Sequence, residues 1–282
     1  MCDKQTRLPH MTPLQPIPTA LQPSGGPTDT VKAIVFDIYG TLFISASGGI
    51  NLTPKTAEPL DQRMTVLLAK YDIAQSPAQL RRSLGNAIGQ RHGELQARGI
   101  AYPEVEIDQV WMQVLNWDDL KKVRAFALAY EMIANPVYPM PHLESLLAAC
   151  RDAHMPMGII SNAQFYTPCL FEHFLGADVQ TLGFADDLTI YSFKTGHGKP
   201  SPYLFQLARK KLQARGLKTK RVLFVGNDML NDIYPAQQAG FQTALFAGDQ
   251  RSLRLRPDDP RCVNLKPDVV ITDLDQLLDH IA

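Results

Sequence analysis

Several features that would mark a particular class of protein are missing from this sequence. Its 282 residues hold 28 Lys and Arg against 28 Asp and Glu, so no net charge attracts nucleic acid or an anionic membrane. The four cysteines are widely separated without a CxxC pair, which excludes a zinc-finger-type site and favours a reducing compartment. No apolar run approaches the roughly 18 residues of a membrane span, and the N-terminus has no secretory pattern. We therefore expect a cytoplasmic protein without nucleic-acid or membrane partners.

The first 30 residues are distinguished by proline. They hold six of the 21 prolines of the chain, which is typical of a linker or tail. The whole chain is 45% hydrophobic and 20% charged, as in ordinary globular proteins, and is long enough to bury a core. We expect residues 1–30 to be a flexible tail and the remainder to fold.

Short apolar runs recur along the rest of the chain and alternate with amphipathic stretches. The runs are rich in β-branched residues and continuous rather than alternating, as in strands of a parallel sheet that is covered on both faces. Strand–helix alternation predicts an α/β fold with a doubly wound, mostly parallel, Rossmann-like sheet. The predicted strands are 31–37, 155–161, 221–227, 242–248 and 267–273, and the predicted helices between them are 142–153, 201–216 and 232–240.

The alternation stops between residues 47 and 139. Several helical patterns follow one another there with no convincing strand between them. One of them begins with Ser76-Pro77-Ala78-Gln79, which has the residues of a capping box and a proline suited to the first helical position. The sequence predicts a helical insertion over 47–139 within an α/β core made of 31–46 and 140–282.

Polar side chains follow three of the predicted strands where each strand ends. The first run stops at Asp37, the second at Ser161 and Asn162, and the third at Asn227 and Asp228. The carboxyl ends of neighbouring parallel strands meet in one crevice, which is the usual ligand site of such sheets. We therefore expect these side chains to converge.

A cation is expected at the same crevice. The segment "GHGKPSPYLF" places Lys199 directly before a proline, and residues before proline favour an extended backbone. Lys199 is therefore predicted in the loop that leads into a helix. One ammonium group there would neutralise part of the carboxylate cluster.

In this order, the segments resemble the haloacid dehalogenase (HAD) superfamily of hydrolases. The resemblance covers residues 31–46 and roughly 137–275, and it implies that the helical insertion is a cap over the substrate. Four motifs carry it: "FDIYGTLF" with Asp37 and Thr41, "GIISNA" with Ser161, "GKPSPYLF" with Lys199, and "VGNDMLNDIYPAQQAG" with Asp232.

The resemblance also implies a mechanism. Asp37 would be the nucleophile that attacks phosphorus or carbon in a small, anionic substrate and forms a covalent aspartyl intermediate. Ser161 and Asn162 would hydrogen-bond the anionic oxygens of the substrate. Lys199 would stabilise negative charge in the transition state.

Residue 39 departs from the phosphatase pattern of this superfamily. Phosphatases carry a second aspartate two residues after the nucleophile, where it acts as general acid and base. Tyr39 stands there, and its ordinary pKa near 10 suits that role poorly at neutral pH. The form "DxYGT", together with Ser161 and Asn162, resembles the 2-haloacid dehalogenases, in which halide leaves without a proton and no metal is required.

The fourth motif favours a phosphatase. Its spacing to Asp232 is phosphatase-like, although Asn227 replaces the usual first aspartate and Asp228 follows it. A Mg²⁺ site is therefore still expected if the protein is a phosphatase. The predicted ligands are Asp37, the backbone carbonyl of Tyr39, Asn227, Asp228 and Asp232.

Three functions stay open from the sequence. A phosphatase is slightly favoured because phosphate chemistry dominates the superfamily. A dehalogenase-like carbon–halogen hydrolase is the alternative, and it would need a basic residue for the substrate carboxylate; the insertion offers Arg63, Arg81, Arg82, Arg91 and Arg98. A catalytically degenerate binding module is the second alternative, since Tyr39 and Asn227 both replace acids.

Overall fold

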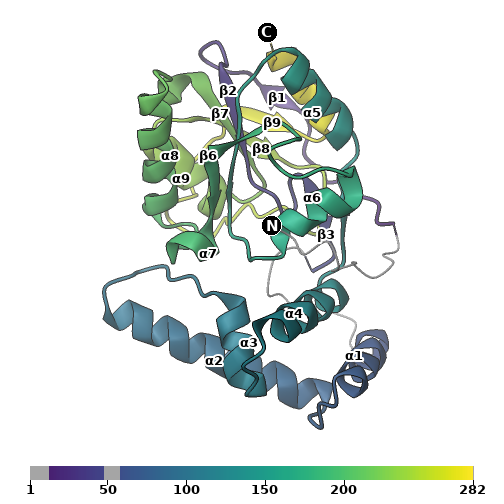
Figure 1. Ribbon diagram of the computed structural model, residues 1–282. Helices are drawn as coiled ribbons and strands as arrows, with labels where there is room; N and C mark the ends of the chain where they lie inside the picture. Colours follow the sequence, from purple (N-terminus) through teal and green to yellow (C-terminus); the bar gives the residue numbers. More distant parts are fainter. Residues whose placement is uncertain (1–12, 48–57, 282) are drawn as a thin grey trace.

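A seven-stranded sheet forms the centre of the protein in the computed structural model, which describes residues 13–47 and 58–281 (Figure 1). The strand order is β1-β9-β8-β7-β2-β5-β6, and all neighbours are parallel except β1, which pairs antiparallel with β9. The predicted α/β fold is confirmed, and each of the five predicted strands is present. The strands are β1 (Ser24–Gly25), β2 (Ala33–Phe36), β5 (Met157–Ser161), β6 (Phe184–Tyr191), β7 (Val222–Gly226), β8 (Gln242–Phe246) and β9 (Val269–Ile271).

Helices cover both faces of this sheet. Figure 1 shows α5 (Leu143–Asp152) and α6 (Thr167–Leu175) on one side, and α8 (Pro202–Ala214) and α9 (Tyr234–Gln238) on the other. Alternate residues of β2 belong to different core clusters, with Ile34 and Phe36 on the α5–α6 side and Ala33 and Val35 on the α8–α9 side. Burial on both faces explains why the strand reads as a continuous apolar run.

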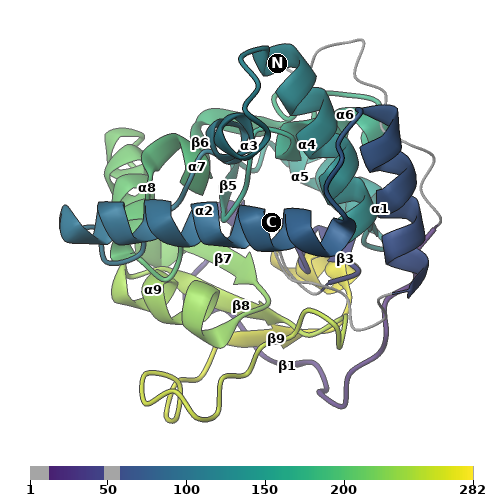
Figure 2. The ribbon, with the colours of Figure 1, turned by 90° about the horizontal axis from the view of Figure 1, so that it is seen from below.

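The inserted helices lie beyond the carboxyl ends of the strands (Figures 1 and 2). They are α1 (Glu58–Lys70), α2 (Pro77–Ala97), α3 (Ile107–Leu115) and α4 (Leu120–Ala134). The predicted capping box forms at the start of α2, where Ser76 and Gln79 exchange hydrogen bonds of 2.8 and 3.3 Å. Trp111 is buried inside this group of helices against Phe126 and Tyr130, so its role there is packing.

Two strands outside the main sheet flank the insertion. β3 (Phe43–Ser45) and β4 (Val137–Pro139) pair antiparallel, so the chain leaves and re-enters the α/β core side by side. Among the remaining short elements, the predicted helix 232–240 is divided between a π-helical turn, η2 (Met229–Ile233), and α9. The others are α7 (Ser192–Thr195), η1 (Thr219–Arg221) and η3 (Leu274–His280).

The described part of the predicted tail is attached to the core. The backbone N–H of Ile17 donates to Asp249 at 3.0 Å, the Thr19 hydroxyl donates to the carbonyl of Ala247 at 2.7 Å, and β1 pairs with β9. Residues 13–30 therefore form an ordered arm in place of the expected flexible tail, and residues 1–12 lie outside the described residues.

Two further observations concern the cysteines and the membrane. Cys150 and Cys262 are buried free thiols. No helix in the described residues combines the length and the apolar character needed to cross a membrane.

Candidate active site

A buried ammonium group bridges two carboxylates at the carboxyl ends of the strands. Nζ of Lys199 lies 2.7 Å from Oδ1 of Asp37 and 2.5 Å from Oδ1 of Asp232. Asp37 follows β2 directly, Asp232 lies in η2, and Lys199 precedes α8 in a loop, as its proline neighbour predicted. The side chains of Lys199, Asp37 and Asp232 are only 3%, 9% and 1% exposed. The structure thus brings together three residues that are 162 and 33 positions apart.

This triad places two carboxyl groups against one ammonium group. Burial opposes the charged form of Lys199, but attraction to Asp232 and Asp37 outweighs burial and raises the pKa of Lys199. Burial raises the pKa of Asp232, and nearby Lys199 opposes that rise. Two carboxylates facing one ammonium group leave a net negative charge when both are ionised.

Asp232 also organises the loop of its own motif. Its Oδ2 accepts hydrogen bonds of 3.0 Å from the backbone N–H groups of Asn227 and Asp228. The carboxylate lies so close to the end of β7 that a Cβ atom at Gly226 would stand 2.4 Å from the Cγ of Asp232. Both carboxylate oxygens of Asp232 are therefore engaged, and glycine is required at position 226.

Asp228 is bound by an arginine outside the triad. Arg256 holds its carboxylate through Nη2 at 2.6 Å and Nε at 3.1 Å, and the backbone N–H of Leu230 donates to the same carboxylate at 2.9 Å. No motif marks Arg256 in the sequence, so this pairing could not be expected. The carboxylates of Asp228 and Asp232 are thus hydrogen-bonded within the protein, and the assignment of both residues as Mg²⁺ ligands stays a prediction.

Three further oxygen atoms of the motif residues have the chemistry that Mg²⁺ prefers. Nδ2 of Asn227 donates to the carbonyl of Ser252 at 2.6 Å, which fixes the orientation of the amide. Its Oδ1 is contacted by the hydroxyl of Thr41 at 3.4 Å, a long distance that leaves this buried acceptor weakly satisfied. Asn227 Oδ1, Oδ2 of Asp37 and the carbonyl of Tyr39 are hard oxygen donors. Mg²⁺ typically uses one or two carboxylates and completes its shell with water and substrate phosphate.

Ser161 is the last residue of β5 and Asn162 follows it, at the same edge of the sheet. Oδ1 of Asn162 accepts a 2.7 Å hydrogen bond from the backbone N–H of Lys199, and its Nδ2 donates to the carbonyl of Lys199 at 3.4 Å. The Ser161 hydroxyl lies 3.3 Å from the carbonyl of Asn162. Asn162 therefore braces the lysine loop, while binding of substrate oxygens by Ser161 stays a prediction.

Tyr39 is held by a partner that sequence analysis did not identify. Its hydroxyl lies 2.9 Å from Oγ1 of Thr167, at the start of α6. Burial, reinforced by the charge of Glu131, raises the pKa of Tyr39 far above its ordinary value near 10. The phenol therefore stays protonated at neutral pH and is a poor general base.

A segment between α2 and α3 lies against the lysine loop. We call residues 102–107, which end at the first residue of α3, the strap. Its Tyr102 carbonyl accepts a 2.8 Å hydrogen bond from the backbone N–H of Gly198, and the backbone N–H of Glu104 donates to the carbonyl of Gly196 at 3.0 Å. Figure 1 shows this connection passing close to α7. The strap thus places part of the inserted helices beside Lys199.

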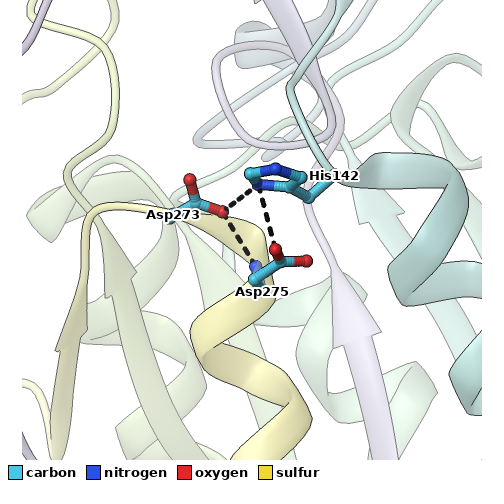
Figure 3. A group of neighbouring side chains, drawn as sticks. All are labelled: His142, Asp273 and Asp275. Atoms are coloured by element: carbon cyan, nitrogen blue, oxygen red, sulfur yellow. Dashed lines mark hydrogen bonds and ion pairs between the residues drawn. The ribbon is translucent and has the colours of Figure 1, made fainter.

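A second group of titratable side chains lies at the start of α5. Figure 3 shows His142 facing Asp273 and Asp275, with Nδ1 at 2.7 Å from Asp273 Oδ1 and 3.3 Å from Asp275 Oδ2. The hydrogen bond that His142 donates to Asp273 raises the pKa of His142. Asp273 also caps η3 by accepting from the backbone N–H of Asp275. These contacts join α5 to η3 and explain the cluster as a structural link on an exposed surface.

Comparisons with known proteins show which family this chain resembles. A family model described as haloacid dehalogenase-like hydrolase matches residues 31–240. A curated relative, ribulose-1,5-bisphosphate 5-phosphatase of Halopiger xanaduensis, is 30% identical over 108 residues, which are 38% of this chain and 44% of that protein. This chain therefore aligns with less than half of that relative.

Solved structures share the fold. A 2-haloacid dehalogenase from Pseudomonas syringae has a TM-score of 0.55 and 21% identity, with 89% of this chain and 97% of that chain covered. A HAD phosphatase from Thermococcus onnurineus has a TM-score of 0.54 and 21% identity, with 88% and 97% covered. At this level of identity the likeness concerns architecture, which dehalogenases and phosphatases have in common.

Proposed function

The chain belongs to the haloacid dehalogenase-like hydrolase family, and we propose that it is a Mg²⁺-dependent phosphatase with Asp37 as nucleophile. In this proposal α1–α4 act as a cap that selects a small anionic substrate. The observation that carries the proposal is the buried triad of Asp37, Lys199 and Asp232, which combines a desolvated carboxylate with a fixed cation.

The triad suits nucleophilic attack by Asp37. Lys199 donates a hydrogen bond to Oδ1 of Asp37 at 2.7 Å, which fixes the orientation of the carboxylate. A carboxylate is a weak nucleophile in water, and burial together with a fixed orientation makes it more effective. Attack on phosphorus forms an acyl phosphate and expels the leaving group. Water then hydrolyses the acyl phosphate, which releases phosphate and restores Asp37.

The charge of the site supports a metal requirement. Two ionised carboxylates and one ammonium group would repel a phosphate dianion if no other cation were present. Held by Asp37, Asn227 and the carbonyl of Tyr39, Mg²⁺ would supply the positive charge that such a substrate needs. Asn227 carries no charge itself, so it binds a metal more weakly than the aspartate that usually stands there.

The leaving group must depart with little help from residue 39. The Tyr39 hydroxyl is bound to Thr167 and buried, so it is poorly placed to protonate an alkoxide. Substrates whose leaving group is a stable anion, such as aryl or acyl phosphates, fit this arrangement better than alkyl phosphates. The resemblance over 108 residues to a phosphatase of a phosphorylated sugar supports phosphate as the group attacked.

A dehalogenase-like reaction is the second candidate, and Tyr39 favours it. Halide leaves carbon as an anion without needing a proton, so a buried, protonated tyrosine at this position would not hinder that reaction. In that case Asp37 attacks carbon, an ester forms, and water hydrolyses the ester.

Assays of purified protein separate these candidates. The substrates are p-nitrophenyl phosphate, with Mg²⁺ or with EDTA, and 2-chloropropionate. We expect phosphate release that requires Mg²⁺, is faster for aryl than for alkyl phosphates, and disappears in Asp37→Asn. Asp108→Asn is the control, because Asp108 is as buried as Asp37 but lies in α3, paired with Arg124. We expect that variant to keep the activity.

Other outcomes point elsewhere. Metal-independent chloride release would replace the phosphatase proposal with the dehalogenase candidate. If neither substrate reacts, and a wider panel of phosphate compounds fails to distinguish Asp37→Asn from the unmodified protein, the chain is better described as a binding module.

A further inference from the structure

We propose that Gln164 is a positioning residue that, through Thr167 and Tyr39, couples the nucleophile loop to the strap. This inference rests on the proposed function only for the role of Asp37 in that loop. It goes beyond that function because it assigns a task to Tyr39, which replaces the expected acid, and to Gln164 and Thr167, which no motif marks.

The whole amide of Gln164 is used to hold the strap. Its Nε2 donates to Oε1 of Glu104 at 3.2 Å and to the carbonyl of Val105 at 2.9 Å. Its Oε1 accepts from the backbone N–H of Ile107 at 3.0 Å. Gln164 is 1% exposed, so these hydrogen bonds are made away from water, where losing one leaves a buried polar group unsatisfied.

The backbone of Gln164 continues this contact toward the nucleophile. Its N–H donates to Oγ1 of Thr167 at 3.1 Å, and the same oxygen is 2.9 Å from the hydroxyl of Tyr39. Thr167 is fully buried and Tyr39 nearly so. A hydroxyl oxygen can accept two hydrogen bonds and donate one, so Thr167 can satisfy both partners at once. The result is a continuous path from the strap to the residue two positions after Asp37.

The strap has a second attachment to the same edge of the sheet. Oε2 of Glu104 accepts a 2.8 Å hydrogen bond from the hydroxyl of Ser192, and that hydroxyl accepts from the backbone N–H of Ala163 at 2.9 Å. Ala163 directly precedes Gln164. The strap is therefore docked on the loop that carries the second motif and beside the loop that carries Lys199.

This arrangement gives a physical reason for tyrosine at position 39. An aspartate side chain is too short to reach the Thr167 position that the phenol occupies. Tyr39 therefore links the nucleophile loop to the inserted helices at the place where the family phosphatases keep a proton donor. The strap lies beside the loop that carries Lys199, and the amide of Gln164 supplies three of the hydrogen bonds that hold it there.

Hydrogen exchange tests the coupling without any substrate. In Gln164→Leu, the backbone N–H groups of residues 104–107 should exchange about 10 to 100 times faster, since several buried hydrogen bonds are lost. Tyr39→Phe removes only the hydroxyl and should speed exchange in the same segment by about 3- to 10-fold. Gln242→Leu is the matched control. Gln242 is also a buried amide with several hydrogen bonds, but these join β8 to the N-terminal arm.

Kinetics give a second readout once a substrate is known. We expect Gln164→Leu to lower kcat/KM about 10-fold or more, and the double variant with Tyr39→Phe to lose less than the product of the two separate effects. Gln242→Leu should lower thermal stability and leave kcat unchanged.

Two results would overturn the inference. If strap exchange in Gln164→Leu matches that in Gln242→Leu, Gln164 does not hold the strap. If Gln164→Leu speeds exchange but Tyr39→Phe leaves the strap unchanged, the path to the nucleophile loop is refuted. Neither result depends on turnover, so a failure of the phosphatase proposal is recognised separately by the absence of activity in the unmodified protein.

Discussion

Lys199→Met tests the electrostatics of the triad. Methionine has a similar length and shape to lysine, so the substitution removes the charge with little change in packing volume. Asp37 and Asp232 then face each other in a nearly solvent-free site with no cation between them. Removing one partner of a buried ion pair costs about 3–5 kcal/mol. We expect a loss of this size at pH 8.

The size of this loss depends on pH, because protonating one carboxylate relieves it. Protonating a carboxyl group costs about 1.36 kcal/mol for each unit by which the pH exceeds its pKa. For an ordinary pKa near 3.9, the cost at pH 5 is therefore about 1.5 kcal/mol. The destabilisation should therefore fall to about 1.5 kcal/mol at pH 5. The sign follows from linkage. Without Lys199, the folded-state pKa of a carboxyl group rises further than in the unmodified protein, where burial already raises that of Asp232, so stability decreases as pH rises from about 4 through that pKa.

Urea unfolding followed by tryptophan fluorescence measures this loss. With a slope of about 3 kcal/mol per M, the midpoint should decrease by about 1–1.7 M at pH 8 and by about 0.5 M at pH 5. Adding Asp232→Asn should recover much of the loss at pH 8. Lys220→Met is the control, because Lys220 is 63% exposed and its ion pair with Asp29 contributes little. A decrease below about 0.3 M at pH 8, or equal decreases at both pH values, would refute the reasoning.

Two further predictions concern packing and surface charge. Gly226→Ala should destabilise the protein by about 1–3 kcal/mol in chemical unfolding, because the new Cβ would lie 2.4 Å from the Cγ of Asp232. Gly89→Ala is the control and should not destabilise the protein, because Gly89 faces open space on α2. Equal effects of the two substitutions would contradict the crowding argument. Asp273 raises the pKa of His142, so this contact stabilises the fold below pH 6.5 and is lost as pH rises through the folded-state pKa. The thermal midpoint of His142→Asn should therefore fall further below that of the unmodified protein at pH 5.5 than at pH 8.5, and a constant difference would exclude the charged contact.

Local patterns were sufficient for most of the core. The run before Asp37 is apolar on both faces because Ile34 and Val35 pack into different layers of the core. The apolar residues therefore predict burial on both faces without any knowledge of distant partners. β6 escaped prediction because it carries polar residues, Asp186 and Asp187, in the middle of an edge strand. The N-terminal arm escaped for a similar reason, since its proline content suggests a tail and its hydrogen bonds to the core come from distant residues.

The sequence by itself determined that Asp37 and Lys199 would lie at one edge of a parallel sheet, because strand ends and a proline-bounded loop are local features. Only the tertiary structure decided what the other polar groups do. Asp228 turns to Arg256, 28 residues away, and Tyr39 meets Thr167, 128 residues away. Such partners are set by the packing of whole elements against one another. The order of the motifs therefore predicts a crevice. The contacts within it depend on how the inserted helices and the loops pack against the sheet.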